Sequence, residues 1–178
     1  MHRYLTSLAI IVAAAVPPAL GQSPYAGMQA RPVKALSDQQ IADLKAGRGM
    51  GLALPAELNG YPGPSHVLEL ADRLGLSDDQ RSAVRRQFEA MKAETIPIGE
   101  QLIGQEAALD ALFAEHRATS KSVTEAAAEI GATQGKLRAA HLKYHLAMLA
   151  LLQPAQVGRY AELRGYRDGA PMHHHPAQ

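Results

Sequence analysis

The chain has 178 residues, of which 47% are hydrophobic, 20% charged and 4% aromatic, with 18 basic against 17 acidic side chains. This composition is typical of a globular protein and excludes a disordered chain or one that crosses a membrane many times. The lack of cysteine excludes disulfides, thiolate metal sites and a cysteine nucleophile, and the near-neutral charge argues against nucleic acid as a partner. Eight histidines in so small a chain raise the question of a histidine function.

Residues 1–21 have the pattern of a secretory signal peptide. A basic start precedes the apolar run 5–20, which is shorter than the roughly 20 residues that a spanning helix needs, and the run closes on small residues at Ala19 and Gly21. We therefore expect cleavage after Gly21 and export, with the bacterial periplasm as the destination. Retention of the segment as a membrane anchor is the alternative.

Residues 22–63 are expected to form a flexible leader that contains one short helix. The stretch 22–35 has two prolines and no hydrophobic periodicity. Ser37 with Gln40 three residues later makes a capping box, which predicts a helix that ends at about Ala46, before a glycine-rich stretch.

A second short helix is predicted directly after a turn rich in glycine and proline. Ser65 is its expected N-cap, and the helix is predicted to run from His66 to about Leu74 with an apolar stripe on one face. Gly75 is expected to end it.

The first long helix is predicted to start at a second capping box, formed by Ser77 and Gln80. The helix is predicted to run from Asp78 to about His116 on the basis of its repeated hydrophobic positions. The side chain of His116 is expected to be solvated. Pro97 lies inside this range, and we expect it to kink the helix without ending it.

The second long helix is predicted over residues 123–152, with Ser122 as the N-cap and Glu125 three residues later. A short polar turn at 117–120 separates it from the first long helix, so the two are expected to form an antiparallel hairpin. Since no segment alternates like a strand, we predict an all-α fold.

A last short helix is predicted to begin at Pro154, which suits the first helical position, and to pass through Tyr160 and Leu163. Together the segments 64–166 are expected to form one helical domain. The remaining residues, 167–178, read as a disordered tail.

The main candidate site is a histidine pair on the second long helix. His141 and His145 are four residues apart, so both rings lie on one face where one metal ion can be held, and Met148 could add a thioether. Their neighbours are almost all apolar, which predicts partly buried rings. In the alternative interpretation each ring hydrogen-bonds a backbone carbonyl or lies at the edge of the core.

Two further ligand candidates, His66 and Glu69, share one face of the short helix before the hairpin. That helix could pack on the hairpin and bring His66 to the histidine pair, although Ser65 and His66 could equally serve as local caps. For Glu69, solvation or an ion pair with Arg73 is the alternative.

The tail carries a second, weaker metal-binding candidate, the run His173, His174 and His175. No catalytic motif is present: there is no His-Glu-x-x-His, no serine elbow, and the glycine-rich stretch 47–51 lacks the Lys-Ser/Thr ending of a phosphate loop. We therefore expect a protein that is not an enzyme.

A repeated Leu-Ser/Thr-x-x-Gln element brackets the predicted hairpin, as Leu76-Ser77-Asp78-Asp79-Gln80 and, in variant form, as Leu152-Gln153-Pro154-Ala155-Gln156. With the signal peptide, this pattern resembles the Spy/CpxP family of periplasmic proteins, which includes the ZraP-like and CnrX-like heavy-metal resistance proteins. The resemblance covers about residues 64–166 and implies a hooked, four-helix, dimeric fold.

The resemblance implies one of two functions. In CnrX-like sensors histidines, a glutamate and a methionine hold nickel or cobalt, so a divalent transition ion (nickel, cobalt, zinc or copper) is expected at His141, His145 and His66, with a membrane-bound signalling partner. Alternatively, as in the chaperone members, the concave face would hold unfolding client proteins, with Arg81, Arg85 and Arg86 among the client-binding residues. Either function implies a homodimer.

Overall fold

The computed structural model describes residues 23–166, and every regular element among them is helical. In chain order the elements are η1 Met28–Ala30, α1 Asp38–Lys45, α2 Leu54–Glu57, α3 Pro64–Glu69, α4 Asp78–Ala114, α5 Ser120–Leu151 and α6 Pro154–Leu163. The predicted all-α class is thus confirmed for this part of the chain. The predicted signal peptide and the three histidines of the tail lie outside the described residues.

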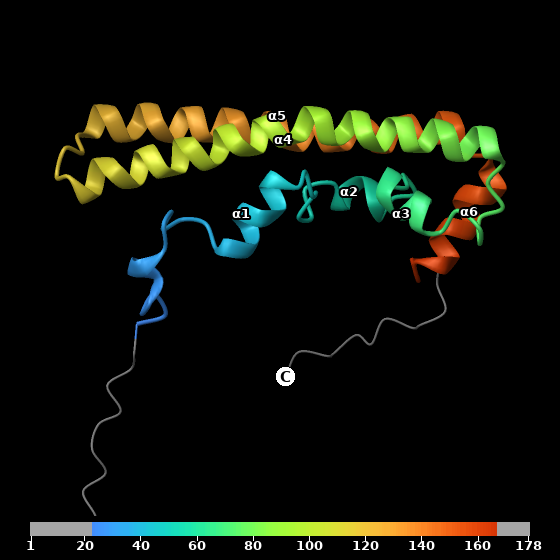
Figure 1. Ribbon diagram of the computed structural model, residues 1–178, viewed down its shortest axis with the longest axis horizontal. Helices are drawn as coiled ribbons and strands as arrows, with labels where there is room; N and C mark the ends of the chain where they lie inside the picture. Colours follow the sequence, from blue (N-terminus) through green and yellow to red (C-terminus); the bar gives the residue numbers. More distant parts are fainter. Residues whose placement is uncertain (1–22, 167–178) are drawn as a thin grey trace, which may run out of the picture.

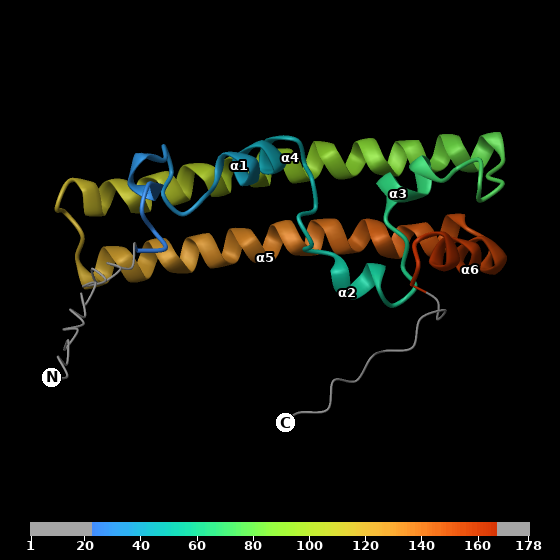
Figure 2. The same ribbon diagram turned by 90° about the horizontal axis from the view of Figure 1, so that it is seen from below.

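The two long helices α4 and α5 lie side by side and run in opposite directions (Figures 1 and 2). The short helices lie along one face of this pair: α1 packs on α4, α2 on α5, and α3 contacts both. At the far end α6 folds back beside α3 (Figure 1). Within residues 23–166, no helix combines the length and the hydropathy that a membrane-spanning segment needs.

The capping boxes predicted for α1 and α4 are both confirmed. At α4 the Gln80 amide donates to Ser77 Oγ at 3.2 Å, and the Gln80 side chain accepts from the Ser77 amide at 3.1 Å. Ser37 and Gln40 make the same pair of bonds at α1. The helix α4 also continues through Pro97, as predicted.

Two helix starts differ from the prediction. Helix α3 begins two residues earlier, at Pro64, with Gly63 as N-cap, and it ends at Glu69 rather than near Leu74. The Ser65 hydroxyl is therefore not a cap; it donates to the Glu69 carboxylate at 3.2 Å. A proline fits the first helical position because it has no amide hydrogen to leave unbonded.

Helix α5 likewise begins earlier than predicted, at Ser120, because Thr119 acts as its N-cap in place of Ser122. The Ser122 amide donates to Thr119 Oγ1 at 3.1 Å, and the Thr119 amide donates to Ser122 Oγ at 3.0 Å. The sequence offers two hydroxyl residues three positions apart, and the structure uses them as the two members of one box.

Part of the expected flexible leader is packed against the long helices. Val33 and Leu36 are buried, with exposed fractions of 6% and 8%, in a cluster completed by Leu44 of α1 and by residues of α4 and α5. Lys34 pairs with Asp110 of α4 at 2.8 Å. Apolar contact and this ion pair hold the segment from Val33 onward, although its sequence has no periodicity.

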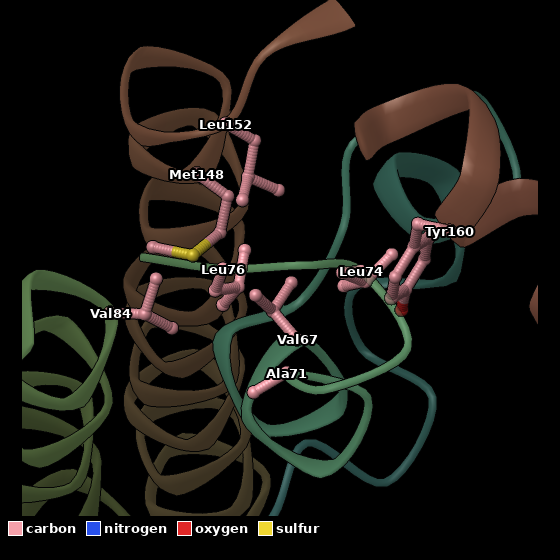
Figure 3. Packing of buried hydrophobic residues seen from close by; sticks show 8 residues of the cluster. All are labelled: Val67, Ala71, Leu74, Leu76, Val84, Met148, Leu152 and Tyr160. Atoms are coloured by element: carbon pink, nitrogen blue, oxygen red, sulfur yellow. The ribbon is translucent and has the colours of Figure 1, made fainter. Parts of the chain in front are cut away.

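A second apolar cluster fills the end of the molecule where α3 and α6 meet the start of α4 and the end of α5 (Figure 3). It consists of Val67, Ala71, Leu74, Leu76, Val84, Met148, Leu152 and Tyr160. Met148 and Val84 have no exposed surface, and Tyr160 is 1% exposed. This cluster fixes α3 and α6 relative to α5, which places the polar groups described next.

Candidate functional site

A cavity of about 670 Å³ lies beneath the short helices. Its lining comes from the glycine-rich segment 46–51, from α2 and α3, and from the facing sides of α4 and α5. The three helical histidines His66, His141 and His145 all line this cavity, and so does Glu69. The structure therefore brings the predicted ligand candidates of α3 and α5 to one place.

The ring of His145 is held by a backbone carbonyl. Its Nδ1 lies 2.7 Å from the Tyr61 oxygen, which accepts the bond, so the ring carries its hydrogen on Nδ1. In the neutral ring the lone pair is then on Nε2. Histidines that bind metals typically have this arrangement, in which the second nitrogen donates to a carbonyl and fixes the tautomer.

The ring of His141, one turn earlier on α5, is 2% exposed. Its Nε2 is buried and has no hydrogen-bond partner among the described residues. Burial and the neighbouring His145 both lower the pKa of His141, so the ring is neutral near pH 7. A buried nitrogen without a partner costs about 1–3 kcal/mol, which a ligand for this atom would offset.

Glu57 of α2 lies at the centre of a polar network that no sequence motif predicted. Its carboxylate is 6% exposed and accepts hydrogen bonds from the Tyr160 hydroxyl, from the Tyr166 hydroxyl at 3.1 Å and from the Gly63 amide at 3.2 Å. Arg164 Nε lies 3.5 Å from the same carboxylate. One acidic side chain thus joins α2 to the loop before α3 and to the end of the described chain.

Two of the histidines also contact this carboxylate. His66 Nδ1 lies 3.3 Å from one oxygen of Glu57, and His145 Nδ1 lies 3.8 Å from the other. Burial alone would raise the pKa of Glu57, but hydrogen bonds from His66, Tyr160 and Tyr166 outweigh it and lower the pKa to about 2. Glu57 is therefore ionised near pH 7, and the two histidines are arranged around a fixed negative charge.

The pKa of Tyr160 is shifted in the opposite direction to that of Glu57. Its ring belongs to the apolar cluster of Figure 3, and its hydroxyl donates to Glu57. Desolvation and the hydrogen bond to the carboxylate both raise the pKa of Tyr160, so the hydroxyl keeps its proton and remains a donor. The apolar core and the polar network are thus joined through one side chain.

The other predicted ligands lie in different surroundings. Met148 is fully buried in the apolar cluster and does not line the cavity, so packing accounts for it. Glu69 is exposed and is bonded to Ser65. Two methionines that no sequence motif marked as ligands, Met50 and Met91, do line the cavity.

No group of three or more histidine and acidic side chains within residues 23–166 is arranged to hold a metal ion. The contacts explain this: Glu57 is occupied by hydrogen-bond donors, and His66 and His145 approach it through their Nδ1 atoms. The arrangement thus offers the Nε2 atoms of His141 and His145 as metal donors. His66 is 38% exposed and would have to turn from Glu57 to join them.

The arginines that were expected to bind clients lie at the start of α4. Arg85 and Arg86 are exposed, whereas Arg81 is engaged within the chain. It donates to the Leu76 carbonyl at 3.2 Å and to Asp72 at 2.7 Å.

Comparison of the chain with models of protein families, with curated proteins and with solved structures gives no match.

Proposed function

We propose that this protein binds a divalent transition metal ion through His141 and His145. The observation that carries the proposal is the buried Nε2 of His141, which has no hydrogen-bond partner within residues 23–166. It lies one helical turn from a second ring whose tautomer is set by a carbonyl. Neutral imidazoles are preferred ligands of zinc, copper, nickel and cobalt. Three or four donors are usual, so a further ligand is required.

His66 is the first candidate for that ligand. It lines the same cavity from α3, and its exposed fraction of 38% leaves room for the ring to turn. If the His66 ring left Glu57 to bind the ion, α3 would lose this contact with α2. A change in the packing of α3 would then be the signal, passed to a membrane-bound partner in the periplasm, as the resemblance to heavy-metal sensors implies.

Calorimetric titration with nickel, cobalt, copper and zinc tests the proposal. The protein is used with His173, His174 and His175 replaced by alanine, which removes the tail as a competing site. We expect binding of at least micromolar affinity, and its loss in a His141→Ala/His145→Ala double variant. Replacement of His116, which is exposed and does not line the cavity, is the matched control and should change nothing. Undiminished binding by the double variant would refute the assignment.

A second candidate function, that of a chaperone independent of ATP, is favoured by exposed apolar side chains beside the cavity. Met50, Leu54 and Leu58 have exposed fractions of 41%, 50% and 56%, and the first two line the cavity. Apolar groups of this kind are suited to holding unfolding clients. This function predicts that substoichiometric protein suppresses aggregation of an unrelated client without metal; a client that aggregates unchanged would exclude it.

A further inference from the structure

Asn59 is the only asparagine in the 178 residues of the chain, and Gly60 follows it. Asparagine is a chemically labile residue, because its side chain loses ammonia when the amide nitrogen of the next residue attacks the side-chain carbonyl and closes a five-membered succinimide ring. Glycine is the most permissive next residue, since it has no side chain to shield the nitrogen or to restrict the backbone. The pair thus contains both reacting groups, and the fold decides whether they are available.

The turn that holds this pair is open to solvent. It follows α2 directly and lies at the edge of the described chain (Figure 2), and both Asn59 and Gly60 are exposed. A Cβ placed on Gly60 would meet no atom within 4 Å. The turn therefore has room for the ring to close, and water has access to it.

The attacking nitrogen is free of hydrogen bonds. Three other glycines with positive φ, Gly47, Gly75 and Gly165, each donate their amide hydrogen to the carbonyl three residues earlier at 3.1 Å. Gly60 has a similar φ of 85°, but its amide has no hydrogen-bond partner within residues 23–166. No bond to this nitrogen therefore has to break before it attacks.

One contact holds the Asn59 side chain away from Gly60. Its Nδ2 donates to the Pro55 carbonyl at 2.7 Å, and this bond must break before Cγ of Asn59 can reach the nitrogen of Gly60. A neutral, solvent-exposed hydrogen bond contributes little net free energy, so its loss should slow the reaction by about two- to tenfold. The fold thus delays the modification without preventing it.

We propose that Asn59 is a site of spontaneous modification. The lone pair of the Gly60 nitrogen forms a bond to Cγ of Asn59, the bond from Cγ to Nδ2 breaks, and the amide hydrogen of Gly60 leaves with Nδ2 as ammonia. Water then adds to one of the two ring carbonyls and opens the ring. Attack at the side-chain carbonyl gives aspartate, and attack at the main-chain carbonyl gives isoaspartate. Water is the only co-reactant, and no atom is oxidised or reduced.

The turn joins two groups of the candidate site, which gives the modification a structural consequence. Glu57 precedes Asn59 by two residues, and the Tyr61 carbonyl, which accepts from His145 Nδ1 at 2.7 Å, follows it by two. The Tyr61 amide donates to the Ala56 carbonyl at 3.0 Å and so closes the turn across Asn59. A change of the main chain at Asn59 is therefore transmitted to the His145 ring.

The two products differ in how they change this turn. In both, the new carboxylate has no hydrogen to donate, so the Pro55 carbonyl loses its bond from Nδ2. In isoaspartate the Cβ also becomes part of the main chain, which lengthens the path from Glu57 to Tyr61 by one atom. We expect the isoaspartyl product to move Tyr61 and weaken its bond from His145, and the aspartyl product to leave that bond in place.

Incubation of the full chain at mildly alkaline pH tests the chemistry, with Asn59→Gln as the matched control. Glutamine keeps the side-chain amide but would have to close a six-membered ring, which forms far more slowly. Trypsin cleaves after Arg48 and Arg73, so mass spectrometry of the peptide 49–73 isolates this position. We expect the natural peptide to show the mass change from amide to carboxylate and to separate into two products, and the glutamine peptide to stay unchanged.

The same incubation in urea measures the rate without the fold. The folded chain should convert within about tenfold of that rate, and conversion in urea alone would overturn the proposal, because the folded turn would then prevent the reaction. An unchanged natural peptide under both conditions would overturn it as well. Asp168 also precedes a glycine, but its isomerisation changes no mass and occurs in a different tryptic peptide.

NMR of the histidine rings in partly converted protein tests the structural consequence. We expect a second set of His145 signals whose share equals the isoaspartyl fraction of the peptide 49–73, whereas freshly prepared Asn59→Asp should show only the first set. Signals of the exposed His116 should not change in either sample. Unchanged His145 signals in isoaspartyl protein would overturn the link between the turn and the candidate site. No metal ion is added, so the result does not depend on the proposed metal binding.

Discussion

The side-chain amides of Gln80 and Gln156 donate hydrogen bonds to each other, from Gln80 Nε2 at 2.9 Å and from Gln156 Nε2 at 3.0 Å. Each amide oxygen also accepts from the backbone amide three residues earlier, at Ser77 and at Gln153. Gln80 Nε2 additionally donates to the Leu151 carbonyl at 2.9 Å. The two repeated elements thus cap their own helices and tie the start of α4 to the end of α5 and the start of α6.

We expect Gln80→Ala to lower the free energy of unfolding by about 1–3 kcal/mol, because it removes a cap and leaves partly buried groups without partners. Gln40→Ala is the matched control, since Gln40 has the same capping role at α1 but no bond to a distant residue; its cost should be about 1 kcal/mol or less. Denaturant unfolding measures both. A double-mutant cycle of Gln80→Ala and Gln156→Ala should give a coupling of about 1 kcal/mol. Equal costs for Gln80→Ala and Gln40→Ala would contradict the cross-helix role.

The features that the sequence predicted well are local ones. The boxes at Ser37 and Ser77 depend on residues three positions apart, so their signal is complete within one helical turn. At α5 the same local signal was ambiguous, because Thr119 and Ser122 both qualify as caps. The choice between them follows from the whole turn after α4, which no single motif describes.

The Glu57 network could not be predicted in this way, because its partners are distant in sequence. Glu57 bonds a tyrosine 103 residues away and lies against a histidine on α5. One signal was present: Glu57 is the only charged residue between Arg48 and Glu69, in an otherwise apolar and turn-rich segment. Met148 shows the opposite case, since its spacing from His145 suggested a ligand, but that side of α5 faces the apolar core.

The free energy of unfolding should depend on pH through the carboxyl group of Glu57. Its pKa is about 2 in the folded protein against 4.5 for the ordinary value, so ionised Glu57 stabilises the fold above about pH 4.5. As the pH falls from 4.5 to 2, this contribution of about 3 kcal/mol should be lost. We expect Glu57→Gln to have a lower free energy of unfolding at pH 7 and a flatter pH dependence than the natural chain.

Urea unfolding at a series of pH values checks this prediction. Exposed Glu100→Gln is the matched control and should follow the natural chain at every pH. The difference between the Glu57→Gln curve and the natural curve isolates this carboxylate from others that titrate in the same range. Parallel curves would show that the network does not hold the charge of Glu57.

Two glycines of α4 should respond oppositely to the same substitution. A Cβ on Gly99 would lie 2.7 Å from the Leu44 carbonyl oxygen, which is backbone and can yield only if α1 moves, whereas a Cβ on Gly104 would meet nothing within 4 Å. We expect Gly99→Ala to destabilise by about 1–3 kcal/mol and Gly104→Ala to stabilise by up to about 1 kcal/mol. Thermal unfolding of the two variants measures the contrast. Stabilisation by both would mean that α1 does not pack closely on α4.

Gly63 should control the position of the His145 ring. A Cβ at this residue would lie 2.9 Å from His145 Cε1 and 3.1 Å from Nε2, closer than side chains normally approach. The backbone of Gly63, at φ −86° and ψ 142°, suits any residue, so Gly63→Ala acts only through this contact. We expect the ring to shift, its bond to Tyr61 to weaken, and affinity for the metal ion to fall by about 10–100-fold.

Gly49→Ala supplies the matched control on the other ring, because its Cβ would lie an ordinary 3.6 Å from His141 Nδ1. Metal affinity by calorimetry and the histidine ring signals by NMR should therefore change in Gly63→Ala and stay near natural values in Gly49→Ala. If Gly63→Ala shifts the His145 signals but leaves the affinity intact, His145 is not a ligand. If neither quantity changes, the ring is not confined by Gly63, and the cavity is more adaptable than its close contacts imply.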